Sequence, residues 1–283
     1  MPSTHIVHLK DYFERVERYP SRKNVLTIGD SWFQYPLRTY LDLQSGIAAN
    51  SRLGRRANIL DDSAPGRDAG EVKGRIAQWR RVAGELAHQQ RPFALILLSL
   101  GGNDVIGHDF RRHIAAGGAP DAAPWPWADE VPEVVRRWLD LAELGRTFDT
   151  IAASYGRILA LRDELAPGAT VVAHTYADVT PMDKPYTFGL PGLRTGPWIW
   201  KYLAPLGLTP TEQKTLVRWL LQSFHALLQH VGAGSRDPGR FVVLDTRLAL
   251  PAAALWDNEI HPRGPGFEQL IDGFWMPALD PLV

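Results

Sequence analysis

Short apolar runs alternate along the chain with longer segments in which apolar residues recur every three or four positions. Five runs have the length and the aliphatic or β-branched composition of strands, at 24–29, 56–60, 93–100, 170–176 and 240–247. This alternation is typical of βαβ units and predicts a parallel sheet. The run 93–100, FALILLSL, is almost entirely apolar, which predicts a central strand covered on both faces.

The segments between these runs predict helices, at 37–50, 70–90, 131–145, 147–166 and 209–232, with a short one near 265–273. Thr209 and Pro210 suit the N-cap and first position of the helix that they begin. We therefore predict a single α/β domain over 1–283, in which a doubly wound parallel sheet of five strands lies in a three-layer α/β/α arrangement. Its core spans about 24–273, and 105–130 and 177–209 are predicted to be loop insertions.

The composition narrows the possible functions. The 283 residues include no cysteine, which excludes disulfides, zinc–thiolate sites and cysteine nucleophiles. Lys plus Arg and Asp plus Glu both number 31, so the net charge gives no reason to expect a nucleic acid as partner. No run is long enough to predict a transmembrane helix, and the charged N-terminal segment does not resemble a secretory signal. These features predict a cytoplasmic protein, and they leave its oligomeric state undecided.

Candidate catalytic residues follow the predicted strands. Ser31 comes directly after strand 24–29, Gly66 follows the second strand, Asn103 follows the third and His261 follows the last. The carboxyl ends of parallel strands meet at one edge of the sheet, where ligands bind in doubly wound folds. Such a histidine can take a proton from the serine, while an asparagine amide and a glycine N–H can stabilise a developing oxyanion. The pattern predicts nucleophilic catalysis.

These motifs, in their order along the chain, resemble the four blocks of SGNH/GDSL hydrolases. The matching residues are Gly29-Asp30-Ser31, then Gly66, then Gly102-Asn103-Asp104, and finally His261-Pro262. The resemblance implies a flavodoxin-like sheet and hydrolysis of a carboxylic ester through an acyl-serine intermediate. It also implies a small-molecule or acylated substrate and no metal or other cofactor. It also implies that the N–H groups of Ser31 and Gly66 and the side chain of Asn103 form the oxyanion hole.

The sequence departs from this family pattern beside the histidine. The family usually has an aspartate three residues before it, whereas here Asn258 takes that position and Asp257 precedes it. Asp257, Asn258 or a backbone carbonyl could orient His261. Asp257 is the preferred candidate because a charged acceptor makes the stronger hydrogen bond.

Two other functions are compatible with parts of the sequence. A binuclear metallophosphoesterase could use Asp30, Asp61, Asp62 and His261 as ligands, although no D-x-H motif precedes them. A non-catalytic protein that binds acyl groups or carbohydrates could also have kept this scaffold. Chelation by EDTA distinguishes the first alternative, and binding without turnover distinguishes the second.

Overall fold

The structure is a computed structural model that describes residues 6–35, 41–49, 53, 56–115, 130–187 and 194–282. Parts of the predicted helix 37–50 and of both predicted insertions lie outside these residues. Among the described helices, none combines the length and the apolar character that crossing a bilayer requires.

The main sheet is entirely parallel, as the strand pattern predicts. Its strand order is β1-β3-β2-β4-β5-β8. The strands are β1 (Ile6–Val7), β2 (Lys23–Gly29), β3 (Ala57–Ser63), β4 (Phe93–Ser99), β5 (Thr170–His174) and β8 (Phe241–Leu244). The five longer strands confirm the five predicted runs, and their order is that of flavodoxin-like sheets. The two-residue edge strand β1, which was not predicted, adds a sixth.

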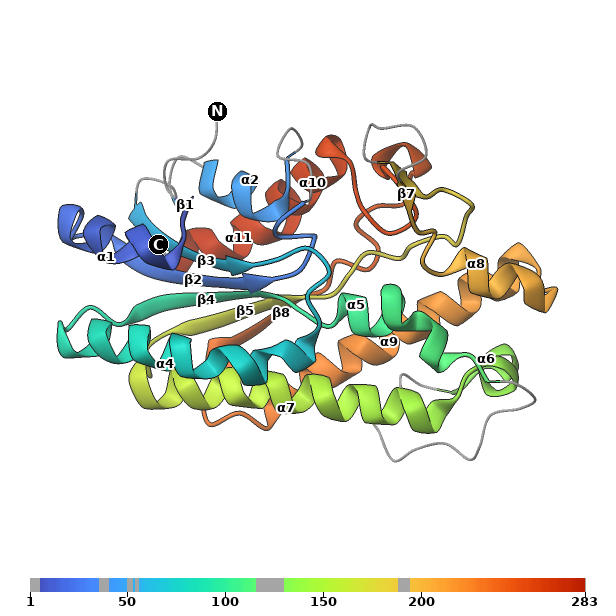
Figure 1. Cartoon of the computed structure of the whole chain (residues 1–283), viewed down its shortest axis with the longest axis horizontal. Helices are drawn as coiled ribbons and strands as arrows, with labels where there is room; N and C mark the ends of the chain where they lie inside the picture. The colour runs from blue at the N-terminus through green and yellow to red at the C-terminus, as the bar shows by residue number, and fades with distance from the viewer. Residues whose placement is uncertain are drawn as a thin grey trace.

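Helices cover both faces of this sheet, which confirms the three-layer prediction (Figure 1). On one face lie α4 (Val72–His88), α7 (Leu141–Leu165) and α9 (Pro210–Ala233). On the other lie α1 (Leu9–Arg18), α2 (Leu43–Ala49), α10 (Gly264–Leu270) and α11 (Met276–Leu279). Helices α5 (Gly102–Ile106), α6 (Glu133–Trp138) and α8 (Trp200–Leu203) lie beyond the carboxyl ends of the strands. A small antiparallel pair, β6 (Tyr186–Thr187) and β7 (Arg194–Thr195), also lies there.

One predicted helix boundary is wrong. The sequence predicts helices at 131–145 and 147–166, with a break near Gly145, but the chain breaks at Leu139 and Asp140 instead. The Asp140 side chain caps the new helix by accepting a hydrogen bond from Glu143 N, and Gly145 is buried inside α7. A side-chain cap satisfies a free helical N–H, and this benefit outweighs the modest cost of one glycine within a helix.

Helix α9 begins as its sequence predicts. Thr209 is its N-cap, Pro210 is its first residue, and Thr209 and Glu212 form a reciprocal capping box.

Buried apolar side chains from Tyr12 to Leu279 form one connected cluster around the sheet. This packing fixes the strand ends from which the candidate catalytic residues project.

Candidate active site

Ser31 lies at the carboxyl end of the central strand β2. Gly29 ends that strand, and a Cβ on this glycine would lie 2.7 Å from the ring of Phe33, so the turn requires a residue without a side chain. Asp30 N–H donates a hydrogen bond to Ser99 O of the neighbouring strand, which continues the sheet pairing one residue further. The turn thereby holds Ser31 at the rim of the sheet, where it is only 6% exposed.

The structure brings Ser31 and His261 together although 230 residues separate them. Ser31 Oγ lies 2.7 Å from His261 Nε2. His261 is 5% exposed, so the contact is largely shielded from water. This is the distance at which a general base accepts a proton from a nucleophilic hydroxyl.

Asn258 makes the hydrogen bond to the other nitrogen of the imidazole. Its Oδ1 lies 2.9 Å from His261 Nδ1, and it also accepts the backbone N–H groups of Ile260 and His261. An amide oxygen only accepts hydrogen bonds, so Nδ1 carries the proton and the lone pair of Nε2 faces Ser31. The neutral Asn258 therefore selects the tautomer that a general base requires.

The preference for Asp257 as the orienting residue is wrong. Asp257 Oδ2 instead accepts a hydrogen bond from Tyr35 Oη at 2.6 Å, and it lies 3.4 Å from Asn258 Nδ2. The cause is the local turn: Asn258 Oδ1 bonds the N–H groups two and three residues later, an arrangement that aspartate and asparagine favour in turns. This turn places Asn258 Oδ1 within hydrogen-bond distance of His261 Nδ1, whereas the Asp257 carboxylate contacts Tyr35.

Burial controls the charge of the imidazole. Desolvation lowers the pKa of His261 to about 3, and the nearby Asp257 carboxylate opposes this shift only partly. Burial disfavours the charged form of a histidine, so the ring is neutral at neutral pH. The neutral imidazole of His261 can therefore accept a proton.

Asn103 lies beside Ser31. It belongs to α5, which begins directly after β4 and Gly101, and it lines a cavity of about 10 Å³ together with Ser31, Gly102 and Ile260. Asn103 Nδ2 donates one hydrogen bond to Arg67 O at 3.0 Å. An amide nitrogen has two hydrogens, so this bond fixes its position and leaves the second hydrogen for a ligand.

Gly66 lies on the neighbouring β3–α4 loop and does not line that cavity. It is exposed and has φ of +75°, a left-handed conformation that glycine adopts without strain. Two hydrogen bonds join its loop to α5, one from Asn103 to Arg67 O and one from Ala69 N–H to Asp104 Oδ2. Asp104 thus connects the two loops, and its burial raises the pKa of its carboxyl group to about 7.

A buried polar network surrounds Asp30, the residue before Ser31. Asp30 Oδ1 accepts hydrogen bonds from Trp32 N and Ser99 Oγ, and its Oδ2 accepts one from Tyr176 Oη. His174 Nε2 lies 2.9 Å from the same Ser99 hydroxyl. Desolvation raises the pKa of Asp30 to about 6, although these hydrogen bonds oppose the shift. The network holds the turn that carries Ser31.

The loop 256–262 also contains a buried acid that the sequence analysis missed. Glu259 accepts backbone hydrogen bonds from Met182, Trp198, Ile199 and Trp200. The ring of Trp198 packs edge-on against His261, with centroids 5.3 Å apart and planes at 82°. Glu259 thereby attaches the segment before α8 to the loop that carries the histidine. Its position two residues before His261 was the available signal.

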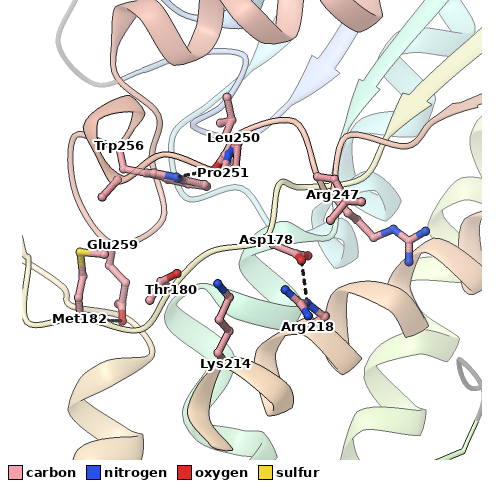
Figure 2. A pocket seen from close by; sticks show the side chains of 12 residues that line it. Asp178, Thr180, Met182, Lys214, Arg218, Arg247, Leu250, Pro251, Trp256 and Glu259 are labelled. Carbon is pink, nitrogen blue, oxygen red and sulfur yellow. Dashed lines mark hydrogen bonds and ion pairs between the residues drawn. The ribbon is translucent and has the colours of Figure 1, made fainter. Parts of the chain in front are cut away.

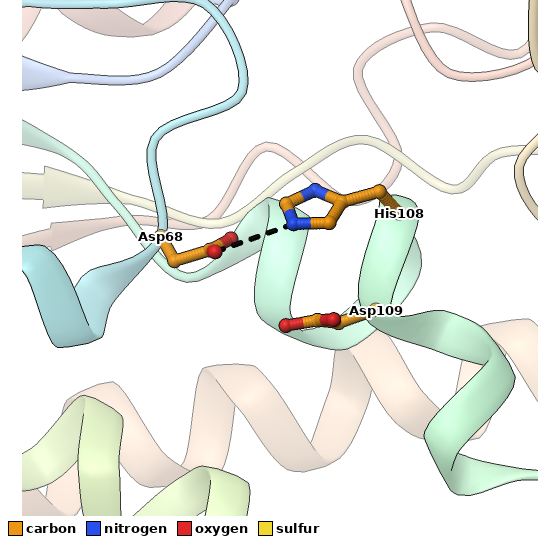
Figure 3. Close-up of side chains that lie close together, drawn as sticks. All are labelled: Asp68, His108 and Asp109. Carbon is orange, nitrogen blue, oxygen red and sulfur yellow. Dashed lines mark ion pairs between the residues drawn. The ribbon is translucent and has the colours of Figure 1, made fainter.

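The acidic residues considered as metal ligands do not gather into one site. Asp62 forms ion pairs with Arg67 and Arg75, and Asp61 Oδ1 accepts the N–H of Ser63. In the part of the chain that the structure describes, one cluster has ligand spacing: Asp68, His108 and Asp109 (Figure 3). His108 Nε2 in that cluster lies 3.3 Å from Asp68 Oδ2, and its ring is largely exposed. The structure therefore does not assemble the ligand set of the metallophosphoesterase alternative.

The sequence matches no family model, but the fold is similar to that of solved structures. Neither a protein-family model nor a curated protein matches the sequence. Among solved structures, the chain is similar to an extracellular lipase from Streptomyces rimosus, with 16% identity, a TM-score of 0.52, and coverage of 92% of this chain and 100% of the lipase.

Two further similarities have lower TM-scores. A GDSL-like lipase from Parabacteroides merdae matches with 11% identity and a TM-score of 0.49, over 93% of this chain and 97% of its own. An acetylxylan esterase from Geobacillus stearothermophilus matches with 14% identity and a TM-score of 0.47, over 93% and 94%. The similarity to the Streptomyces rimosus lipase confirms the predicted fold: the chain has the α/β/α fold of that lipase.

Proposed function

We propose that the protein is a serine hydrolase that cleaves carboxylic esters through an acyl-serine intermediate. The proposal rests on two hydrogen bonds that join three side chains. Ser31 Oγ lies 2.7 Å from His261 Nε2, and His261 Nδ1 lies 2.9 Å from Asn258 Oδ1. A nucleophile, its base and a group that orients the base are the parts that this chemistry requires.

In the first half of the reaction, Ser31 Oγ attacks the carbonyl carbon of the ester while His261 Nε2 takes the hydroxyl proton. The carbonyl oxygen becomes an oxyanion, for which the free hydrogen of Asn103 Nδ2 and the N–H groups of Ser31 and Gly66 are the proposed donors. The C–O bond to the alcohol then breaks as the carbonyl re-forms. His261 returns its proton to the departing alcohol, which leaves the acyl group on Ser31.

In the second half, water attacks the acyl-serine while His261 takes one of its protons. The tetrahedral intermediate collapses, the proton passes to Ser31 Oγ, and the carboxylic acid leaves. Asn258 accepts the Nδ1 hydrogen bond throughout, so the imidazole keeps its orientation in both halves. Asp257 acts from a greater distance, because its charge partly offsets the desolvation of the imidazolium that forms transiently.

Hydrolysis of p-nitrophenyl esters of increasing acyl length tests the proposal. The wild-type protein is expected to turn over at least one of these esters, with activity retained in EDTA, whereas Ser31→Ala is expected to lose nearly all turnover and keep its fold. Loss of activity in EDTA would favour metal-dependent chemistry. Saturable binding of the esters without turnover would favour a non-catalytic binding protein.

A further inference from the structure

A second cavity lies behind the loop that carries His261. Its volume is about 280 Å³, and it is enclosed by the chain after β5, by α9 and by residues 247–259 (Figure 2). Its lining includes Trp256 and Glu259 but shares no residue with the small cavity beside Ser31. A ligand in this cavity would thus be separate from one that contacts the nucleophile.

One side of the cavity is cationic. Lys214 and Arg218 project from α9, and Arg247 comes from the chain after β8 (Figure 2). Arg218 Nε pairs with Asp178 Oδ2 at 3.1 Å, and Arg247 makes two short contacts with Asp245. Within the described residues, Lys214 has no such partner, and Figure 2 shows its amino group directed into the cavity. Among the described residues of this lining, Lys214 is therefore the cation that no carboxylate contacts directly, although its charge acts on Asp178 together with those of Arg218 and Arg247.

The opposite side of the cavity is apolar. Leu250, Pro251 and Trp256 lie there, across the cavity from Lys214 and Arg218, and Ala253 also belongs to the lining. Trp256 Nε1 donates a hydrogen bond to Leu250 O at 3.2 Å, which fixes the indole in the cavity wall. Apolar walls with a few placed polar groups are typical of small-molecule sites.

The remaining acid in the lining does not cancel the charge of Lys214. The Glu259 carboxylate already accepts four backbone N–H groups from the segment 182–200. These donors compensate its charge locally, as hydrogen bonds to a carboxylate do. An anion that enters the cavity would therefore meet Lys214, with the Arg218 guanidinium beside it.

We infer that this cavity binds a small organic carboxylate with a compact apolar body, placing the carboxylate at Lys214 and the body against Trp256 and Leu250. The volume, slightly below the roughly 300–1,000 Å³ of pockets for drug-sized ligands, suits a single ring or a short branched chain rather than a long acyl chain. This inference does not depend on the proposed ester hydrolysis, because it concerns a separate set of residues.

Calorimetric titration of the full chain with benzoate tests the inference, with benzamide as a neutral probe of the same shape. Saturable binding of benzoate, and much weaker binding of benzamide, is expected. Lys214→Gln is expected to weaken benzoate binding by about fivefold, the upper range for one exposed ion pair. Lys73→Gln, which removes an exposed lysine of α4 outside the cavity, is the matched control and should have no effect.

A second variant tests the apolar side without changing charge. Ala253 is exposed at the cavity wall, so Ala253→Phe should fill the space and abolish benzoate binding while the protein stays folded. Equal binding of benzoate and benzamide would overturn the inference, as would equal losses in Lys214→Gln and Lys73→Gln. Inorganic phosphate that binds as tightly as benzoate would also overturn it, because the apolar wall would then contribute nothing.

Discussion

At the scale of single residues, the site depends on an amide where a carboxylate would be the more common choice. Asn258 orients His261 without charge, and the nearest carboxylate, on Asp257, contacts Tyr35 and Asn258 rather than the imidazole. A neutral acceptor stabilises an imidazolium less than a charged one does. The base is therefore fixed in position while its pKa remains low.

Substituting Asn258 and Asp257 one at a time separates the orientation of His261 from the effect of a nearby negative charge. Asn258→Ala removes the acceptor of Nδ1 and should lower kcat by at least about 10²-fold, the lower end of what general-base catalysis supplies. Asp257→Asn keeps a hydrogen-bonding group near Tyr35 and should lower kcat much less. Steady-state kinetics with one p-nitrophenyl ester measures both. A larger loss in Asp257→Asn would mean that charge, not position, is the main contribution of this loop.

The low pKa of His261 predicts an unusual pH dependence. Because the pKa is lowered to about 3, the imidazole stays neutral well below the pH at which an ordinary histidine is protonated, near 6.5. The acid limb of kcat/KM should therefore lie below pH 5. Asn258→Asp places a negative charge beside Nδ1 and should move this limb to higher pH. The pH profiles of both proteins test this, and an acid limb near 6.5 in the wild type would contradict it.

The proposed oxyanion donor has its own test. Asn103→Ala keeps Ser31 and His261 in contact but removes the amide, so kcat should fall by about 10²–10³. KM should change little, because the bond is strongest when charge develops on the oxygen. Unchanged kcat in this variant would remove Asn103 from the mechanism.

At the scale of elements, the catalytic loop 256–262 and the segment before α8 depend on each other. Glu259 accepts four backbone N–H groups from that segment, which also carries Trp198 against His261. The carboxylate is buried, and desolvation raises its pKa. Four donors directed at one side chain indicate that its acceptor capacity is fully used.

Glu259→Gln should weaken this connection. Glutamine has one acceptor oxygen, so buried N–H groups would lose their partners, at a cost of about 1–3 kcal/mol each. Urea unfolding is expected to show the lower stability, and kcat is expected to fall because Trp198 no longer holds the imidazole in place. Glu268→Gln, an exposed residue of α10, is the control. Wild-type stability and kcat in Glu259→Gln would contradict this coupling.

The elements also show what the sequence can and cannot predict. Strands such as Phe93–Ser99 were predicted because burial on both faces requires a continuous apolar run. The strand ends then brought Ser31, Asn103 and His261 toward one edge. Asp257 was preferred because of its charge, although the family pattern places the orienting residue three positions before the histidine, where Asn258 lies. The turn that Asn258 Oδ1 forms keeps the orienting group at that position. Glu259 was missed because its partners are backbone groups, which no side-chain pattern reveals.

At the scale of the whole molecule, three histidines are buried among the described residues: His113, His174 and His261. His174 lies in β5 between Phe33, Tyr176 and Trp275, and desolvation lowers its pKa to about 3. In the unfolded chain its pKa returns to about 6.5. The unfolded state therefore binds the proton more readily than the folded state. The contribution of His174 to the free energy of unfolding is complete above pH 6.5 and is lost as the pH falls toward 3.

His174→Gln should reduce this acid sensitivity. Glutamine remains neutral and can still form a hydrogen bond with the Ser99 hydroxyl. Between pH 6 and 4 the free energy of unfolding should therefore fall less in the variant than in the wild type, and the difference should be about 1.4 kcal/mol per pH unit. Urea unfolding at several pH values measures the slope. The exposed His8→Gln is the matched control. Parallel slopes for His174→Gln and the wild type would show that burial of His174 does not govern acid stability.

The most direct test of the account is covalent labelling of the nucleophile. A fluorophosphonate is attacked by an activated serine hydroxyl, which releases fluoride and leaves a stable phosphonyl group. Mass spectrometry of the digested protein should find this group on the peptide that contains Ser31, with none on Ser31→Ala and much slower labelling in His261→Ala. An unlabelled wild-type protein, or labelling that persists in Ser31→Ala, would contradict the assignment of Ser31 as nucleophile.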